Sequence, residues 1–428
     1  NIKGSYGSFD TYKTSASYGK RFSNGVEAFL SGSIYDSSGM GRVFSKEFDN
    51  PATNNGIYLN NDQEKAKKLL GKLSYGDFSL EGAIVRRQKR IPTASFETVF
   101  NDPRTHTNDQ EAFIYLNYEH TFENQVNLKS RISYNSYRYI GDFPADFSDN
   151  GDLSDIAVNK DVTHGEWWRG TTELSKVIFD DHRVTVGGEI QHDFDQFLGN
   201  YNSFSNRTGD IIQSDKSSYR WALFGQDEYR INDQFTFNAG LRYDFYSIFG
   251  GTINPRLALI YNPWKQTTVK LLYGTAFRAP SQFEINTPFG GSLANPDLQP
   301  EQLETTELIL EHYFNDHLRG EFNLFHTKVT DIIAQVSISE EITQNRNVDD
   351  VKSNGFELQL EDNWGDGFQG RISYSWQDTK NKTTNTRLSN SPEHMVKVNL
   401  IAPLWQDIVF LGLETQYMSG RKVPAKTP

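Results

Sequence analysis

Apolar and polar residues alternate along much of this chain with a period of two. In the segment 184–194, Val184, Val186 and Ile190 share one face of an extended strand, whereas Glu189 lies on the other. Because successive side chains of a strand point to opposite faces, this pattern predicts strands with one apolar and one polar surface. Such strands suit both a soluble antiparallel sheet and a transmembrane barrel.

The alternation and the turn residues together predict about 19 strands. Their approximate spans are 2–8, 11–22, 26–37, 66–75, 78–88, 111–122, 125–139, 166–179, 182–195, 218–231, 234–249, 252–262, 267–278, 302–314, 317–336, 347–362, 368–378, 392–403 and 408–420. Several of these spans exceed the ~9–11 residues that cross a bilayer. We therefore expect the strands to project beyond the membrane.

The connections between these strands alternate between short and long. The short ones, such as 23–25, 76–77 and 180–181, consist of Asn, Asp, Ser and Gly, which tolerate the backbone of tight hairpins. The long ones are 38–65, 89–110, 140–165, 196–217, 279–301, 337–346 and 379–391, with one tight exception near Gly250. Outer-membrane barrels have short turns on one side of the bilayer and long loops on the other. The sequence thus predicts an all-β fold, a transmembrane antiparallel β-barrel.

Composition narrows the function classes. The net charge of −12 argues against a nucleic-acid partner, because phosphate contacts need clustered Lys and Arg. No run of about 18 apolar residues marks a spanning helix. Cysteine is absent, which excludes disulfides and thiolate metal sites. No nucleophile–base pair, phosphate-binding loop or zinc spacing emerges, so we do not expect an enzyme.

Two motifs resemble a known family. Phe277-Arg278-Ala279-Pro280 is followed by Asn295-Pro296-Asp297-Leu298-Gln299-Pro300-Glu301 and then by alternating strands. This passage resembles the barrel of TonB-dependent outer-membrane receptors, and the resemblance covers the whole chain, 1–428, as one partial barrel domain. Members of that family have about 22 strands around a plug domain. By that comparison, we expect the plug, the coupling segment near the N-terminus and about three final strands to be missing from this chain.

The resemblance implies a function. We expect a receptor in the bacterial outer membrane that imports a scarce nutrient, first a ferric siderophore and second cobalamin or a similar ligand. Its expected partners are membrane lipid and lipopolysaccharide, a metal chelate, and the TonB energy-transducing complex, and we expect a monomer. Haem receptors of this family carry a histidine between the two motifs, and residues 281–294 contain none. The polar lumen also fits a passive porin, which is the main rival from another class.

Candidate binding residues fall in or near the long connections. The basic cluster 86–90 either attracts an anionic ferric chelate or binds lipopolysaccharide phosphates. Arg278 either pins the end of its strand, where Pro280 stops the ladder, or contacts the ligand. Trp168 opens a predicted strand next to Trp167, and one of the two is expected in the interfacial aromatic belt. The full set of candidate ligand-binding residues is Arg86, Arg87, Arg90, Phe96, Phe143, Trp168, Tyr201, Phe204, Arg278, Phe283 and Phe289.

An acidic stretch, 142–161, is the only candidate metal site. Asp146-x-Ser148-x-Asn150-Gly151 is similar to the opening of a calcium-binding loop, but Ala157 stands where a bidentate Glu is required. The candidate calcium ligands are Asp146, Asp149 and Asp152. The alternative is a hydrated acidic loop facing lipopolysaccharide.

Overall fold

The computed structural model describes residues 1–95, 98–148, 155–203, 208–286, 292–340, 342–364, 367–405 and 408–422. Its strands are β1 (Ile2–Gly7), β2 (Thr11–Arg21), β3 (Glu27–Ser37), β4 (Arg42–Phe44), β5 (Ile57–Leu59), β6 (Glu64–Tyr75), β7 (Phe78–Arg90), β8 (His106–Thr121), β9 (Asn127–Asp146), β10 (Ile156–Ile178), β11 (His182–Ser203), β12 (Thr208–Arg230), β13 (Phe235–Tyr246), β14 (Gly250–Trp264), β15 (Thr267–Arg278), β16 (Ser292–Leu293), β17 (Glu301–Tyr313), β18 (Leu318–Ser337), β19 (Thr343–Asn363), β20 (Gln369–Asn381), β21 (His394–Trp405) and β22 (Val409–Met418). Helices are few: the 3₁₀ turns η1 (Lys46–Phe48) and η2 (Pro51–Gly56), and the short α1 (Gln282–Asn286). No helix of these residues is long and apolar enough to cross a membrane.

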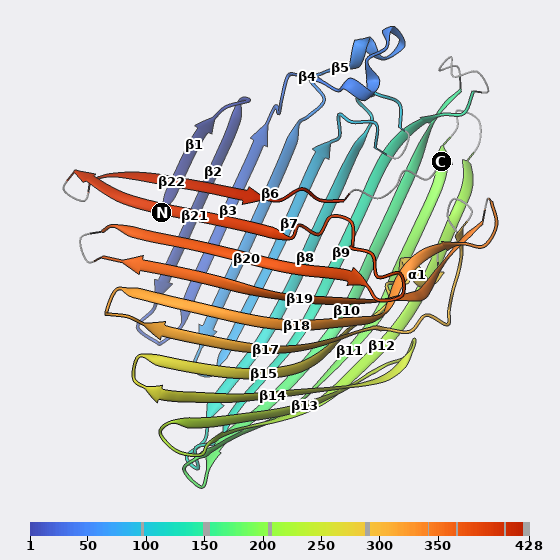
Figure 1. Cartoon of the computed structure of the whole chain (residues 1–428). Coiled ribbons are helices and arrows are strands. Elements are labelled where there is room, and N and C mark those ends of the chain that lie inside the picture. Colours follow the sequence, from blue (N-terminus) through green and yellow to red (C-terminus); the bar gives the residue numbers. More distant parts are fainter. Residues whose placement is uncertain are drawn as a thin grey trace.

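All strands except β4, β5 and β16 form one meander in which each pairs antiparallel with the next along the chain. In the part of the chain that the structure describes, these 19 strands confirm the number predicted from sequence. They curve into a barrel wall with the short turns at one end and the long connections at the other, except for tight connections such as 247–249, which lie at the end of the long ones (Figure 1). We call these the inner and outer ends. The long connections carry the β4–β5 hairpin, η1, η2, α1 and β16.

Register assigns the two faces of the wall. On β13, Leu241 lies opposite Gly225 and Pro255, and its neighbour Arg242 lies opposite Phe224 and Asn254. Leu241 is 55% exposed although it is apolar, as expected for a side chain that meets lipid. The other face carries charged and amide side chains and forms the lumen.

Several predicted loops are strand instead. Most of 140–165 belongs to β9 and β10, and most of 196–217 belongs to β11 and β12, which reach 22 and 23 residues. Part of 337–346 likewise belongs to β19. These predictions were wrong because the strands continue beyond the bilayer, where water bathes both faces. There the ladder still satisfies the backbone, but no apolar face is required and the alternation disappears.

Buried apolar side chains gather at the outer end. They include Tyr58, Phe143, Ala157, Ile285 and Leu298, the last only 1% exposed. Each lies in a long connection or in the outer part of a strand. The barrel wall is a single layer, and its buried apolar packing therefore lies mainly at the outer mouth.

Candidate functional site

Arg278 fixes the connection between β15 and β17 at the outer mouth. It ends β15 on the lumen side, opposite Glu301. Its Nε donates to Glu301 Oε2 at 2.8 Å, and its Nη1 donates to Glu284 Oε2 on α1 at 3.0 Å. Burial raises the pKa of Glu284, but hydrogen bonds from Arg278 and Ser281 outweigh it and hold the pKa below its ordinary value. The guanidinium thus ties α1 to the barrel wall.

The Asn-Pro motif that follows is a docking segment. Asn295 donates to the carbonyl oxygen of Asn345 at 2.7 Å, and the amide of Gln299 donates to Asn347 Oδ1 at 2.9 Å. Leu298 between them is almost fully buried. Both asparagines on the far side belong to β19, so this motif anchors the connection against the neighbouring wall.

Helix α1 reaches into the lumen. Gln282 Nε2 donates to Gln196 Oε1 on β11 at 3.1 Å. Gln196 lies opposite Gly165 on the inward face, so α1 contacts a strand on another part of the wall. Ile285 is 6% exposed, whereas Phe283 is 54% exposed. Of the predicted aromatic contacts in this connection, Phe289 lies outside the described residues.

The lumen wall opposite α1 carries a network of charged and amide side chains. Arg169 donates to Glu189 at 2.7 Å, Arg220 donates to Gln191 at 2.6 Å, and Arg242 lies 2.8 Å from the buried Asp244. The sequence placed Glu189, Gln191, Arg242 and Asp244 on one polar face, and the register confirms it. Since Glu189 and Asp244 each pair with an arginine and Gln191 accepts from Arg220, these contacts cross-link the side chains of the wall and stiffen it.

Above this network the lumen face becomes rich in amides. Asn159 donates to Asn200 Oδ1 at 2.9 Å and to Asn202 Oδ1 at 2.8 Å, and Asn200 is hydrogen-bonded to Asp161. Phe143 lies opposite Asn159 and is 5% exposed. This upper wall offers hydrogen-bonding groups to whatever enters the mouth, whereas Phe143, a predicted ligand contact on the same face, is buried.

Two other long connections pack on each other. Phe48 stacks on Phe100 with ring centroids 4.6 Å apart, and Tyr58 contacts Phe100 edge-on while only 4% exposed. Lys89 Nζ donates to Asp62 Oδ1 at 2.5 Å. These loop aromatics therefore hold the loops together. Phe96, a predicted ligand contact in the same connection, lies outside the described residues.

The basic cluster of β7 divides between the two faces. Arg87 lies opposite Ala66 and Lys89 opposite Glu64, on the lumen side, where Arg87 Nε donates to Glu64 at 2.8 Å. Arg86 and Arg90 point outward, because they share a face with Ile84. A linear run of basic residues is therefore not one binding site, and Arg86 and Arg90 lie outside the lumen.

Two predicted aromatic contacts also face away from the lumen. Trp168 lies within β10 and does not open it, is 51% exposed, and contacts Tyr134 with ring centroids 5.0 Å apart. This position suits the aromatic belt. Tyr201 lies opposite Lys160 on the outward face of the projecting strands. Phe204 lies outside the described residues.

The acidic stretch contains no completed cation site in the part that the structure describes. Asp146 accepts hydrogen bonds from the amide and hydroxyl of Ser148, and Asp142 pairs with Lys160 at 2.7 Å. No group of three metal-ligating side chains occurs among the described residues. Asp149 and Asp152 lie outside them, so calcium binding stays a prediction.

Sequence reasoning missed the groups that position α1. Glu284, Gln196, Gln282 and Asn345 are ordinary polar residues in predicted loops. The only available signal was the spacing of Glu284 six residues after Arg278, which allows an ion pair across a turn. The residues of β11 and β19 that contact α1 are distant from it in sequence, and no local sequence signal identifies them.

Comparison with known proteins agrees with this architecture. Residues 47–427 match the family model "TonB dependent receptor-like, beta-barrel". The iron-regulated outer membrane virulence protein of Vibrio cholerae is 27% identical over 269 residues, which are 56% of this chain and 40% of that protein. The ferrienterobactin receptor of Escherichia coli is 25% identical over 244 residues, 50% of this chain and 32% of the relative. The chain thus spans less than half of the curated relatives that it matches.

Solved structures show the same barrel. The ferric enterobactin receptor of Pseudomonas aeruginosa superposes with a TM-score of 0.74 at 16% identity, over 95% of this chain and 65% of that one. The pyoverdine receptor of the same species gives a TM-score of 0.75 at 12% identity, over 97% and 67%. The match over most of the chain shows that it belongs to the family of TonB-dependent receptor β-barrels, which lie in the bacterial outer membrane.

Proposed function

We propose that this barrel belongs to a receptor that imports a ferric siderophore with TonB-coupled energy. The observation that carries the proposal is the family match over 47–427. Relatives named for iron regulation, ferrienterobactin, enterobactin and pyoverdine support the ligand class. The energy would arrive through the TonB complex of the inner membrane, and the receptor would work as a monomer.

The mouth of the lumen supports this ligand class. Phe283 presents a half-exposed ring on α1, and the amides of Asn159 and Asn202 line the upper wall. An exposed aromatic residue and hydrogen-bonding groups at the same end of the lumen suit a large, partly flat chelate. In this proposal Phe283 contacts the ligand, and Arg278 positions α1. Arg87 is already paired with Glu64 and shapes the wall.

Uptake by cells tests the proposal. Cells that carry the intact gene or its deletion receive radiolabelled ferric enterobactin, ferric pyoverdine or cobalamin, with and without a protonophore. We expect saturable, gene-dependent uptake of a ferric siderophore that ceases without the proton gradient. Energised uptake of cobalamin alone would show that the ligand is cobalamin and not a ferric siderophore. Uptake that persists with the protonophore would favour a porin.

Substitution of Phe283 tests the site. Phe283→Ala should raise the Kd for the siderophore about 2- to 13-fold, since stacking contacts contribute about 0.5–1.5 kcal/mol beyond burial. The matched control is Phe179→Ala, because Phe179 is 85% exposed in the turn between β10 and β11 at the inner end. Equal affinity of both variants would remove α1 from the site.

A further inference from the structure

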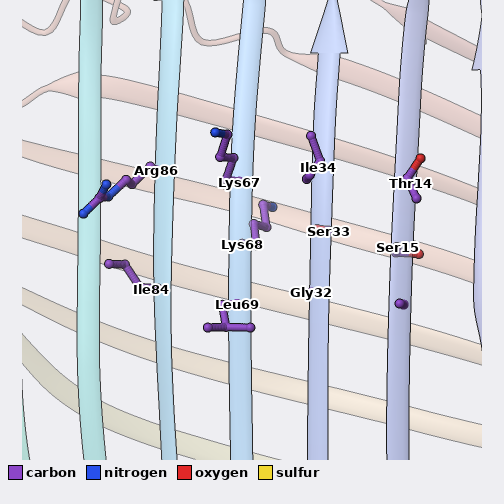
Figure 2. A pocket seen from close by; sticks show the side chains of 11 residues that line it. Thr14, Ser15, Gly32, Ser33, Ile34, Lys67, Lys68, Leu69, Ile84 and Arg86 are labelled. Atoms are coloured by element: carbon purple, nitrogen blue, oxygen red, sulfur yellow. The ribbon is translucent and has the colours of Figure 1, made fainter.

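The barrel wall is split between β14 and β15 at the outer end. The two strands pair from the inner end up to Arg256 and Gly274. Beyond that point β14 continues as 250–255, paired with β13 alone, and β15 continues as 275–278, paired with β17 alone. We call this break in the wall the outer seam. The wall is unbroken across β2, β3, β6 and β7, where the register and Figure 2 place in one row Thr14, Ile34, Lys67 and Arg86.

Pro255 ends the ladder between the two strands. The amide of Asn262 donates to the carbonyl oxygen of Gln234, and opposite residues of an antiparallel pair alternate in bonding, so the even-numbered residues of β14 bond to β13. The backbone of the odd-numbered residues, Pro255 included, therefore faces β15. Proline has no N–H, so Thr275, the residue next in register on β15, has no donor opposite it. A sheet tolerates proline at such an edge.

Neutral side-chain contacts close the outer seam. The ring of Phe277 meets the rings of Tyr246 and Phe249 edge-on, with centroids 5.6 and 6.2 Å away. The hydroxyl of Thr275 donates to Asn254 Oδ1 at 3.5 Å, which is a long hydrogen bond. Among the described residues, no ion pair or backbone pair crosses the seam. The seam is therefore held more weakly than the paired ladder below it.

Helix α1 is fastened firmly to the β15 side of the seam and loosely to the far wall. On the β15 side, Arg278 holds Glu284 by charge-assisted hydrogen bonds, and Asn345 Nδ2 donates to the carbonyl oxygen of Glu284 at 3.2 Å. On the far side, the hydrogen bond that the structure describes is the neutral one from Gln282 to Gln196. Parting of the seam would therefore carry α1 away from β11.

We propose that the outer seam opens and closes to let the ligand pass α1. When β14 and β15 part, the outer end of β15 moves with α1, and the hydrogen bond between Gln282 and Gln196 breaks. When the seam closes, Phe277 returns to its aromatic neighbours and α1 again reaches into the lumen. The ladder from Arg256 and Gly274 inward stays paired and serves as the hinge. The inference rests on the proposed import function, but the opening itself is a property of the wall.

Hydrogen exchange of the intact receptor tests the seam without ligand or substitution. The register directs the amides of Ala276 and Arg278 toward β17 and those of Thr275 and Phe277 toward β14. We expect the first two amides to exchange slowly, because their ladder is complete, and the second two to exchange fast. Equally slow exchange of all four amides would show that the two strands are zipped together, and it would overturn the proposal.

A tether across the seam tests its role in import. The sequence contains no cysteine, so Asn254→Cys/Thr275→Cys supplies the two thiols, which a short bis-methanethiosulfonate joins and dithiothreitol releases. We expect cells with the tethered receptor to import no more radiolabelled ferric siderophore than cells without the gene, and to recover import after release. The matched control is Ala258→Cys/Leu272→Cys, because these two residues are already paired below the seam, so a tether there should leave import unchanged.

The outcomes separate this inference from the proposed function. Full import through the tethered seam, or equal loss in the control, would overturn the inference while siderophore import still stands. If the unsubstituted receptor imports cobalamin and no ferric siderophore, the proposed ligand class fails, and the same tether is tested with labelled cobalamin. Pro255→Val tests the seam without thiols, because it returns the missing N–H opposite Thr275. It should slow both the exchange of the Thr275 amide and the rate of import, and unchanged values of both would refute the inference.

Discussion

Replacing Arg278 by Met should loosen α1 without unfolding the barrel. The guanidinium makes paired contacts to Glu301 and Glu284, whose side chains are only 16% and 21% exposed. Exposed ion pairs contribute about 0.2–1 kcal/mol, and charge-assisted hydrogen bonds about 1.5–3 kcal/mol. Arg278 itself is 46% exposed, so solvent screening favours the low end. We therefore expect α1 to lose about 1–2 kcal/mol of docking free energy.

Hydrogen exchange measures this loss directly. The amide of Ile285 donates to Ser281 O at 3.1 Å, and the amide of Asn295 donates to Ile285 O at 2.9 Å. If these amides exchange through undocking of α1, the variant should accelerate them about 5- to 30-fold. Arg371→Met is the matched control, because Arg371 pairs with Glu361 at 3.2 Å near the inner end and is 52% exposed.

The result separates two roles that the sequence left open for Arg278. Faster exchange with weaker siderophore binding supports a positioning role through α1. Unchanged exchange of Ile285 and Asn295 together with lost binding would refute the reasoning, because Arg278 would then contact the ligand itself. Unchanged exchange and unchanged binding would show that the Asn-Pro segment alone anchors the connection.

Three further predictions test the face assignment, the packing of the lumen and the acidity of the mouth. Leu358→Arg on the lipid face should cost ~2–4 kcal/mol and abolish heat-modifiable mobility on gels, whereas Gln359→Arg on the lumen face should not. Gly187→Ala places a Cβ 2.6 Å from a backbone carbonyl oxygen and should cost about 1–3 kcal/mol in unfolding experiments, whereas at Gly225 the nearest atom is 3.9 Å away. The pKa of Glu284, which pairs with Arg278, is lowered. Its contribution to the docking of α1 is therefore complete above pH 4.5 and is lost as the pH falls through the lowered pKa. Pepsin should accordingly cleave 279–300 faster only at lower pH.

Much of the wall could be predicted from sequence because a bilayer imposes a repeated rule. Wherever lipid covers one face, apolar residues must appear at every second position, and β13 and β19 were located within a few residues. Where the strands leave the membrane, this constraint ends. The outer parts of β10 and β11 therefore looked like loops, although their ladders continue to Ile156 and Ser203.

The candidate site was harder to predict because side-chain direction matters more than proximity in sequence. Arg86 and Arg87 are neighbours, yet one faces lipid and the other faces the lumen. The cluster of β7 looked like one electrostatic feature only while its strand register was unknown. Similarly, the sequence predicted that Trp168 opens a strand, but Trp168 lies inside β10. Its place in the register, opposite Tyr134, turns its side chain outward, toward the aromatic belt.

In the structure the two family motifs hold the backbone of the outer mouth in place, and in the proposed function the ligand is contacted by residues between them. Arg278 pairs with Glu301 and with Glu284 of α1, Glu301 also accepts from the amide of Ile333, and Leu298 is buried, so all three motif residues are engaged within the protein. What they position is Phe283, which stands outside both motifs and remains half exposed. Under the proposed function, the nutrient would change with the residues between the motifs while the scaffold stays the same. It follows that an exchange of 282–294 between two such barrels should transfer more of the ligand preference than an exchange of either motif.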